Sequence, residues 1–321
     1  MKRKLNVLIA CEESQTVCRA FRLLGHNSYS CDLFECSGTI FGSDQTDPHP
    51  EWHFHHDIFE VLDKSNVVLQ NGLKAVVEGD WDIMICHPPC TYLAVSGAKW
   101  MYHPKDKNLP VEQRRPHPNF PNRKKDQEDG ARFFMSLAEA DIKRIAIENP
   151  IGVMSRLWRK PDQLIQPYMF GDPFTKNTCL WLKNLRLVHP SNETKDHGDR
   201  IYFESGKSHP KWYSDGLTKT KTKEERQRWR SKTFPGIARA LAEQWTIQIA
   251  AEENLLTEDE WAIIGYDYLQ VLDKMTGGIR YRNSRADVMM EKKRFNGHFD
   301  SGLLEDIENR EQNLIKYWMS K

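Results

Sequence analysis

A short apolar run near the N-terminus, LNVLIA at residues 5–10, constrains the fold of this chain more than any other segment. The run is rich in branched side chains and does not alternate with polar residues, so it predicts a strand buried on both faces. Residues 14–24 then carry apolar side chains at helical spacing, with Ser14 as the expected helix cap and Gly25 as the stop signal. A buried strand followed by a helix indicates a parallel sheet with helices packed on its faces.

The same alternation of strands and helices continues along the chain. We expect further strands within 26–34, 81–89, 142–150 and 178–188, and helices within 126–141 and 236–250. This order of elements predicts an α/β protein with a doubly wound, Rossmann-like sheet. The C-terminal part of the chain is highly charged with a helical pattern, so we expect a small helical appendage after the core.

The overall composition excludes a strong global charge. The chain has 321 residues with 46 lysines and arginines against 45 aspartates and glutamates, so attraction to nucleic acid must come from local clusters. No apolar run reaches the length of a membrane-spanning helix, which favours a cytoplasmic protein without a membrane partner. The seven cysteines are unevenly spaced and odd in number, so we expect reduced thiols and no disulfide framework.

Three acidic residues follow expected strands, at the edge where open α/β sheets bind their ligands. Asp32 can accept both hydroxyls of a ribose, or it can be a simple turn residue. Asp57, in HHDIF, can accept from an adenine amino group or be an ordinary loop residue. Glu148 precedes a rigid Asn-Pro pair, so its carboxylate can be aimed at a ring nitrogen of a base; the alternative is a solvated acid at a strand end.

Cys90 follows two prolines in MICHPPCTYLAVSG, residues 84–97, and three roles are open to it. It is a nucleophile if its surroundings favour the thiolate, and its place at a strand end near a basic loop leads us to expect a lowered pKa. A metal site would also use Cys86 and His87, but no paired Cys-x-x-Cys motif is present and the common zinc patterns are not matched. The third role is purely structural. We favour the nucleophile and expect no metal.

Two basic segments are candidates for nucleic-acid contacts. The first is a proline-rich loop at 101–125, and loops of this length are uncommon unless they are functional or disordered. The second is a run of lysines and arginines at 219–232 with aromatic residues nearby. This run predicts contacts with phosphates and bases, or alternatively a solvated charged helix, because Glu224 and Glu225 interrupt it.

The order of these features resembles that of the cytosine-C5 DNA methyltransferases, in particular the small divergent members common in bacteriophages and prophages. The resemblance rests on the strand–helix–acid unit at 5–32, on Asp57, on the Pro-Pro-Cys segment and on ENP at 148–150. YMFGDPFTKNTCLWL at 168–182 stands where the family has a Gly-x-Pro-Gln-x-Arg-x-Arg strand. SKTFPGIARALAEQW at 231–245 is similar to the closing motif and helix of the family.

The resemblance, which covers residues 5–250, implies a DNA (cytosine-5-)-methyltransferase that uses S-adenosylmethionine and acts on double-stranded DNA. Cys90 would attack C6 of a cytosine flipped out of the helix, and Glu148 would contact N3 and the amino group of that base. Lys176 would supply the positive charge of a family arginine. The expected cofactor-binding residues are Cys11, Glu12, Ser14, Asp32, Asp57, Asp82 and Pro89, with Asp32 on the ribose and Asp57 on the adenine.

The resemblance also implies a DNA surface and a division of the chain. The expected DNA-binding residues are Arg114, Arg115, Lys124 and Lys125 in the loop after Cys90, and Lys221, Arg226 and Arg228 in the second basic run. The expected parts are a catalytic and cofactor-binding core at 1–188, a short target-recognition segment at 189–232, a closing helix at 233–250 and a helical extension at 251–321. We expect a monomer in the cytoplasm of a bacterial host cell.

The cofactor loop departs from the family pattern. The stretch ACEESQT, residues 10–16, has no glycine, so its backbone cannot approach the cofactor in the usual way. Side chains would then contact the methionine amine of the cofactor instead. The candidates are Glu12, Glu13 and Ser14.

The base-activating strand departs as well, since Lys176 and Thr178 replace the two family arginines. Lysine keeps the charge but not the planar fork of arginine, so Arg200 or the run at 219–232 could take over. These departures leave two other functions open. An enzyme of the same fold could add a different group to cytosine or act on RNA, and an inactive relic could bind DNA without catalysis.

Overall fold

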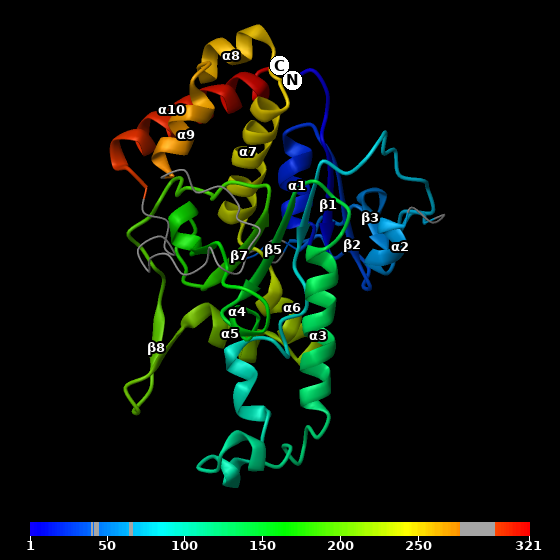
Figure 1. The fold of residues 1–321 in the computed structure, drawn as a ribbon, viewed down its shortest axis with the longest axis vertical. Coiled ribbons are helices and arrows are strands. Elements are labelled where there is room, and N and C mark those ends of the chain that lie inside the picture. The colour runs from blue at the N-terminus through cyan, green and yellow to red at the C-terminus, as the bar shows by residue number, and fades with distance from the viewer. Residues whose placement is uncertain (40, 42–44, 64–66, 277–298) are drawn as a thin grey trace.

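The computed structural model describes residues 1–39, 41, 45–63, 67–276 and 299–321. Within them the chain forms an α/β fold around a seven-stranded, mostly parallel sheet (Figure 1). The strand order is β3-β2-β1-β4-β5-β7-β6. The strands are β1 (Asn6–Ala10), β2 (Asn27–Asp32), β3 (His53–His55), β4 (Ile83–Cys86), β5 (Ile145–Pro150), β6 (Gln163–Ile165) and β7 (Thr178–Lys183).

The parallel pairs confirm the α/β prediction, and β7 adds a feature that the sequence did not indicate. β1 pairs in parallel with β2 and β4, and β4 with β5, whereas β7 runs antiparallel to both β5 and β6. The sheet remains compatible with a Rossmann-like architecture. β6 was not predicted, because it has only three residues and shows no periodic pattern.

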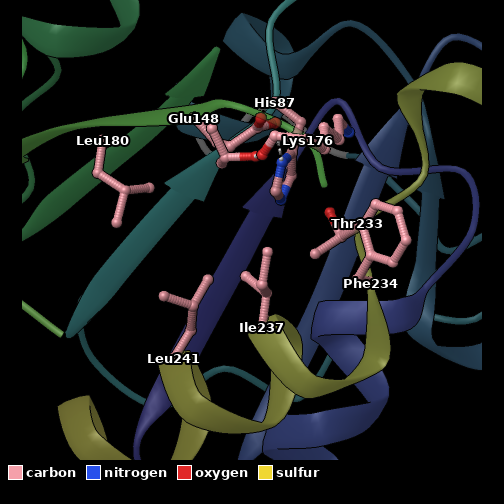
Figure 2. A pocket seen from close by; sticks show the side chains of 9 residues that line it. His87, Glu148, Lys176, Leu180, Thr233, Phe234, Ile237 and Leu241 are labelled. Atoms are coloured by element: carbon pink, nitrogen blue, oxygen red, sulfur yellow. Dashed lines mark hydrogen bonds and ion pairs between the residues drawn. The ribbon is translucent and has the colours of Figure 1, made fainter. Parts of the chain in front are cut away.

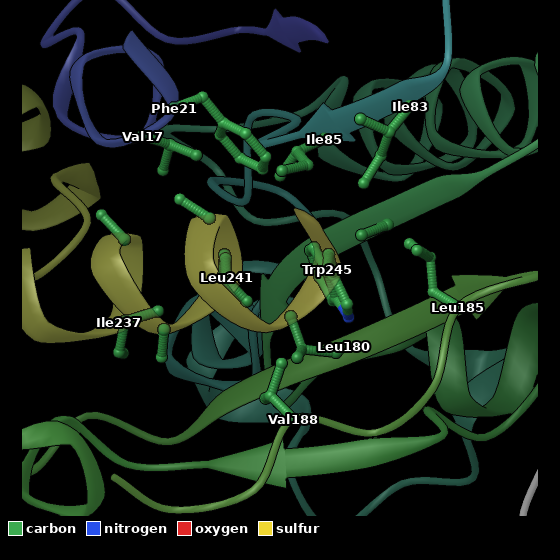
Figure 3. Close-up of a cluster of buried hydrophobic side chains, with 14 of the residues drawn as sticks. Val17, Phe21, Ile83, Ile85, Leu180, Leu185, Val188, Ile237, Leu241 and Trp245 are labelled. Carbon is green, nitrogen blue, oxygen red and sulfur yellow. The ribbon is translucent and has the colours of Figure 1, made fainter. Parts of the chain in front are cut away.

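Two hydrophobic cores cover the two faces of the sheet, because alternate residues of each strand point to opposite sides. Val7 and Ile9 of β1 pack with α1 (Thr16–Leu23) and α7 (Pro235–Glu252). Figure 3 shows this core, in which Val17 and Phe21 of α1 lie near Leu241 and Trp245 of α7. Leu8 and Ala10 of β1 face the other core, which contains apolar residues of α2 (Ile58–Leu62), α3 (Arg123–Ala138) and α4 (Met154–Leu157).

The start of α1 differs from the prediction. The helix begins at Thr16 and the Ser14 hydroxyl bonds the hydroxyl of Thr16, so Ser14 does not cap the helix. The cap is the carboxylate of Glu12, which accepts the backbone N–H of Val17 at 2.7 Å and that of Cys18 at 3.1 Å. A carboxylate at a helix N-terminus satisfies donors that have no partner within the helix.

The segment after Cys90 is mostly irregular, as expected, with three short 3-10 helices at Val95–Trp100, Pro104–Asp106 and Val111–Gln113. It extends beyond the sheet beside the lower end of α3, far from the two chain ends (Figure 1). Between β7 and α7 lie β8 (Arg200–Tyr202), β9 (Ser208–Pro210), α5 (Lys211–Lys219) and α6 (Lys223–Ser231).

The C-terminal part is helical in the residues that the structure describes. Its helices are α8 (Glu258–Ile264), α9 (Tyr268–Met275) and α10 (Ser301–Met319), and they share a third core with the end of α7. Residues 277–298 of the expected extension lie outside the described residues. None of the helices in the described part of the chain has the length and apolar character needed to cross a membrane.

Candidate active site at the carboxyl edge of the sheet

The strand order reverses between β1 and β4, and open α/β sheets bind ligands in the crevice at such a point. The loop after β1 and the loop after β4 both begin at this crevice. The backbone N–H of His87, directly after β4, donates to the carbonyl of Ala10 at 2.9 Å and fastens the two loops together. The structure therefore places the predicted loops at the edge where a site can form.

Cys11, Asp32 and Asp57 come together at this edge, as predicted. Cys11 follows β1 with a positive φ of 60°. Burial raises the pKa of its thiol, and the nearby Cys86, Asp32 and Asp57 raise it further. Asp57 is the N-cap of α2, where its carboxylate accepts the backbone N–H of Phe59.

Asp32 ends β2 with a carboxylate that is mostly withdrawn from water. Burial raises the pKa of Asp32 to about 6, and the nearby Glu13 also raises it, while backbone hydrogen bonds and Arg228 lower it. One carboxylate oxygen accepts the backbone N–H of Phe34 at 3.0 Å. A buried acid at the end of the second strand suits a ligand that donates hydroxyl hydrogens to it.

Glu12 and Glu13 of the glycine-free loop have different contacts. Each oxygen of Glu12 accepts a backbone N–H of α1, so Glu12 serves as the helix cap, and its contact with the cofactor stays a prediction. Glu13 is 8% exposed, and its Oε2 atom has no hydrogen-bond partner among the described residues. Burial lowers the pKa of Lys232 and the negative charge of Glu13 raises it, so the two groups lie within electrostatic range of each other.

The prediction for Asp82 is wrong, because Asp82 lies at the opposite end of β4 from the crevice. It immediately precedes the strand, and its carboxylate forms a two-pronged ion pair with Arg3 at 2.7 and 2.6 Å. It also accepts the backbone N–H of Asn6 at the start of β1. Asp82 therefore fastens the amino-terminal edge of the sheet.

The three predicted catalytic residues meet beside the crevice. Glu148 lies in β5, next to β4, and its Oε2 atom is 3.2 Å from Nδ1 of His87 (Figure 2). Lys176 precedes β7, and its ammonium group donates to the carbonyl of Lys232 at 3.2 Å. Burial acts to raise the pKa of Glu148, but Lys176 and His87 outweigh burial and hold this pKa below its ordinary value. Glu148 is therefore a carboxylate at neutral pH.

The thiol of Cys90 differs from the prediction in its acidity. Burial raises the pKa of Cys90 and the negative charge of Glu148 raises it further, while Lys176 and a backbone hydrogen bond lower it. The expected lowering is wrong because the loss of hydration outweighs the one nearby cation. Cys86, the last residue of β4, is fully buried in the core that contains Leu8 and Ala10.

The Cys90 loop is tied to the loop after β5. The side chain of Asn149 donates to the carbonyl of Pro88 at 2.8 Å, and the backbone N–H of Val153 donates to the carbonyl of Leu93 at 2.9 Å. Gly152 lies so close to Leu93 that a Cβ atom there would clash with the Leu93 carbonyl. Pro89, which lies between Pro88 and Cys90 in the chain, is exposed at the surface of this loop.

A cavity of about 10 Å³ lies beneath these groups, close to the space that one water molecule needs. Figure 2 shows its lining, which comes from β4, β5, β7 and the start of α7. The lining residues are His87, Glu148, Lys176, Thr178, Leu180, Thr233, Phe234, Ile237 and Leu241. Sequence reasoning treated His87 only as a metal ligand; its position between a buried strand and two prolines was the signal that could have identified it.

The structure shows the contacts of Thr178, of the suggested substitute Arg200 and of Lys176. The Thr178 hydroxyl donates to the carbonyl of Lys176, so it does not replace an arginine in function. Arg200, a suggested substitute, lies in β8, where it bonds Ser208 and is 3.3 Å from the hydroxyl of Thr175. It does not line the cavity. Lys176 is the cation that acts on Glu148 and Cys90.

The residues predicted to bind DNA fall into two groups. Arg114 donates to the carbonyls of Lys107 and Leu109, and Arg115 pairs with the buried carboxylate of Asp106, so both stabilise their own loop. The contact with Arg115 holds the pKa of Asp106 below its usual range.

The other predicted DNA contacts lie on helices. Lys124 and Lys125 are exposed in the first turn of α3, and Lys221 is exposed just before α6. Arg226 is half-buried in α6. Arg228 lies over the Phe34 ring, 4.4 Å from its centroid, which places it at the acidic crevice.

No cluster of three or more His, Cys, Asp or Glu side chains suited to a metal ion occurs in the part of the chain that the structure describes. A comparison of the sequence with protein-family models and with curated proteins gave no match. The site must therefore be interpreted from its own geometry and chemistry.

Proposed function

We propose that the protein is a DNA (cytosine-5-)-methyltransferase that transfers a methyl group from S-adenosylmethionine to C5 of a cytosine flipped out of double-stranded DNA. The observation that carries this proposal is the meeting of Cys90, Glu148 and Lys176 beside an acid-lined crevice at the point where the strand order reverses. A thiol with a carboxylate and a cation within electrostatic range of it are the groups that covalent activation of a pyrimidine needs.

In this proposal Cys90 acts as the nucleophile. Its sulfur forms a bond with C6 of the base, and C5 then gains carbanion character. The proton of the Cys90 thiol would pass to Glu148, which would hold it against N3 of the ring as the bond between sulfur and C6 forms. Lys176 favours both the thiolate and the carboxylate through its charge. C5 would form its bond to the methyl carbon as the bond from that carbon to the cofactor sulfur breaks. Loss of the C5 proton to solvent would then break the bond between C6 and the Cys90 sulfur and release a thiolate, which takes up a proton again.

The crevice residues suit S-adenosylmethionine, which supplies an electrophilic methyl group when bound. The buried carboxylate of Asp32 can accept the ribose hydroxyls. Glu13 offers a buried oxygen without a partner, which suits a positively charged amine, and Lys232 beside it suits a carboxylate. Asp57, the N-cap of α2, would contact the adenine.

The base pocket must open before a cytosine can enter, because the cavity holds about 10 Å³. The hydrogen bond between Lys176 and the carbonyl of Lys232 closes one wall. A shift of Lys176 from that carbonyl toward the base would open the wall and bring its charge to the ring. Extrusion of the base from the stack accompanies this step in enzymes that modify bases within duplex DNA.

Incubation with radiolabelled S-adenosylmethionine and DNA of varied sequence tests the proposal. We expect label in cytosine-containing duplex DNA, and mass spectrometry of the digested product should show 5-methylcytosine. A different mass on cytosine would instead support an enzyme that adds another group, and label in RNA alone would indicate an RNA substrate. DNA binding without any modified base would support the inactive relic.

A further inference from the structure

His87 is held at the boundary between the crevice and the cavity by contacts on both sides. Its side chain is 8% exposed, and its backbone N–H donates to Ala10 of the neighbouring strand. On the cavity side, its Nδ1 atom lies 3.2 Å from Oε2 of Glu148. Lys176 lines the same cavity. The ring is therefore fixed by the fold and cannot turn freely toward water.

The protonation pattern of this pair follows from the charge of Glu148. The charge of Lys176 and the hydrogen bond from His87 keep Glu148 ionised, so its oxygens only accept hydrogen bonds. The Nδ1 atom of His87 must then carry the hydrogen of the 3.2 Å contact. In the neutral imidazole this leaves Nε2 with a lone pair, which also accepts.

Two buried acceptors in the cavity wall thus have no partner among the described residues. They are Nε2 of His87 and Oε1 of Glu148. Buried polar atoms are rarely left without a hydrogen bond, because each costs about 1–3 kcal/mol. Two neighbouring acceptors suit a group that donates two hydrogens.

We propose that His87 is a base-reading and positioning residue, which orients Glu148 through Nδ1 and makes the pocket select a pyrimidine with an exocyclic amino group. This inference rests on the proposed function. The amino group of cytosine donates two hydrogens, whereas the corresponding carbonyl of uracil or thymine would face two acceptors and be repelled. The structure thereby assigns part of the choice of base to a residue outside the Cys90–Glu148–Lys176 set.

The test compares two duplex DNAs that each trap a covalent adduct, one with 5-fluorocytosine and one with 5-fluoro-2-pyrimidinone, which lacks the amino group. Trapping rates are measured with S-adenosylmethionine on denaturing gels for the wild type, His87→Leu and His87→Gln. We expect His87→Leu to slow trapping of 5-fluorocytosine about tenfold more than trapping of the pyrimidinone. His87→Gln keeps a donor for Glu148 and should restore part of the preference.

Equal slowing on both DNAs would show that His87 has only a structural role and would overturn the inference. If His87→Leu does not fold, as judged by circular dichroism, the comparison between His87→Gln and the wild type decides: a reduced preference for 5-fluorocytosine over the pyrimidinone supports the inference, and an unchanged ratio, with or without slowing on both DNAs, overturns it. Absence of any adduct with the wild type would overturn the proposed function itself, and with it this assignment.

Discussion

The side-chain amide of Asn149 donates a 2.8 Å hydrogen bond to the carbonyl of Pro88, and this bond fastens the loop that carries Cys90 to the strand that carries Glu148. The two loops follow neighbouring parallel strands, β4 and β5. A second attachment, between Val153 and Leu93, lies just beyond it. The distance between nucleophile and carboxylate is therefore set by loop-to-loop contacts as well as by the sheet.

The first prediction concerns this attachment. Gly152→Ala should slow covalent trapping of a cytosine analogue about tenfold or more, because the new Cβ atom would displace the Leu93 carbonyl and shift the Cys90 loop. Gly130→Ala is the matched control, since its Cβ would meet the Leu93 side chain at an ordinary 3.6 Å. If both variants trap at the wild-type rate, the attachment does not position Cys90.

The second prediction concerns the acidity of Cys90. Glu148 raises the pKa of this thiol and Lys176 lowers it, so Glu148→Gln should lower the pKa and Lys176→Met should raise it. At a fixed pH near neutrality, alkylation of Cys90 by iodoacetamide should become about threefold to tenfold faster in the first variant and slower in the second. Mass spectrometry identifies the modified cysteine. Glu139→Gln, at an exposed acid, should change nothing.

The third prediction concerns Asp32, whose pKa burial raises to about 6. When the pKa of a carboxyl group is raised in the folded protein, the free energy of unfolding falls as pH rises from the ordinary pKa through the raised one. The reason is that the carboxyl group ionises more easily in the unfolded chain. Asp32→Asn should therefore stabilise the free protein at pH 7.5 by about 2 kcal/mol. It should also weaken binding of S-adenosylmethionine at least tenfold.

Thermal melting and calorimetry check the two effects of this change. Asp141→Asn, at an exposed position, is the control and should leave both quantities unchanged. Higher stability with unaltered cofactor affinity would place the cofactor elsewhere. Lower stability would show that Asp32 gains more from its hydrogen bonds than it loses by burial.

The fourth prediction concerns the attachment of the C-terminal helices. His189 lies 3.0 Å from Glu311 of α10, and Tyr268 of α9 donates to the same carboxylate at 2.6 Å. Burial acts to lower the pKa of His189, but Glu311, the Pro190 carbonyl and Glu308 raise it above its ordinary value. The stabilisation is therefore complete below the ordinary histidine pKa of 6.5 and is lost as pH rises through the raised pKa.

Hydrogen exchange of α10 measures this dependence. After correction for the intrinsic exchange rate, α10 should open more readily at pH 9 than at pH 6, and Glu311→Gln should lose about 1–3 kcal/mol of protection at pH 6. Glu305→Gln, at an exposed position of α10, serves as the control. Protection that does not change with pH in the wild type would show that the ion pair is not what holds α10.

Much of the central sheet could be predicted because its strands carry their own signal. The runs that became β1, β4 and β5 are short, apolar and branched, and the helices between them have a clear period. The direction of β7 could not be predicted, since a strand has the same periodicity whichever way it runs. The position of Asp82 was predicted wrongly for a related reason, because the sequence WDIMIC does not show which end of β4 lies at the ligand-binding edge.

The residues of the candidate site were easier to predict than their chemistry. Cys90, Glu148 and Lys176 meet as expected, because each lies in or next to a strand that the sequence predicts. The pKa of Cys90 depends on how much water the fold removes, which no local pattern records. His87 was missed because its partner, Glu148, lies far away along the chain and meets it only when β4 pairs with β5.

The covalent adduct tests the central claim most directly. Duplex DNA with 5-fluorocytosine at the target position should form a complex with the protein and S-adenosylmethionine that survives denaturation, with the DNA linked to Cys90 in the peptide map. Cys90→Ser should form none, while Cys18→Ala, in the buried face of α1, should still form it. Absence of a complex on any cytosine-containing sequence, or a complex that persists in Cys90→Ser, would contradict the account.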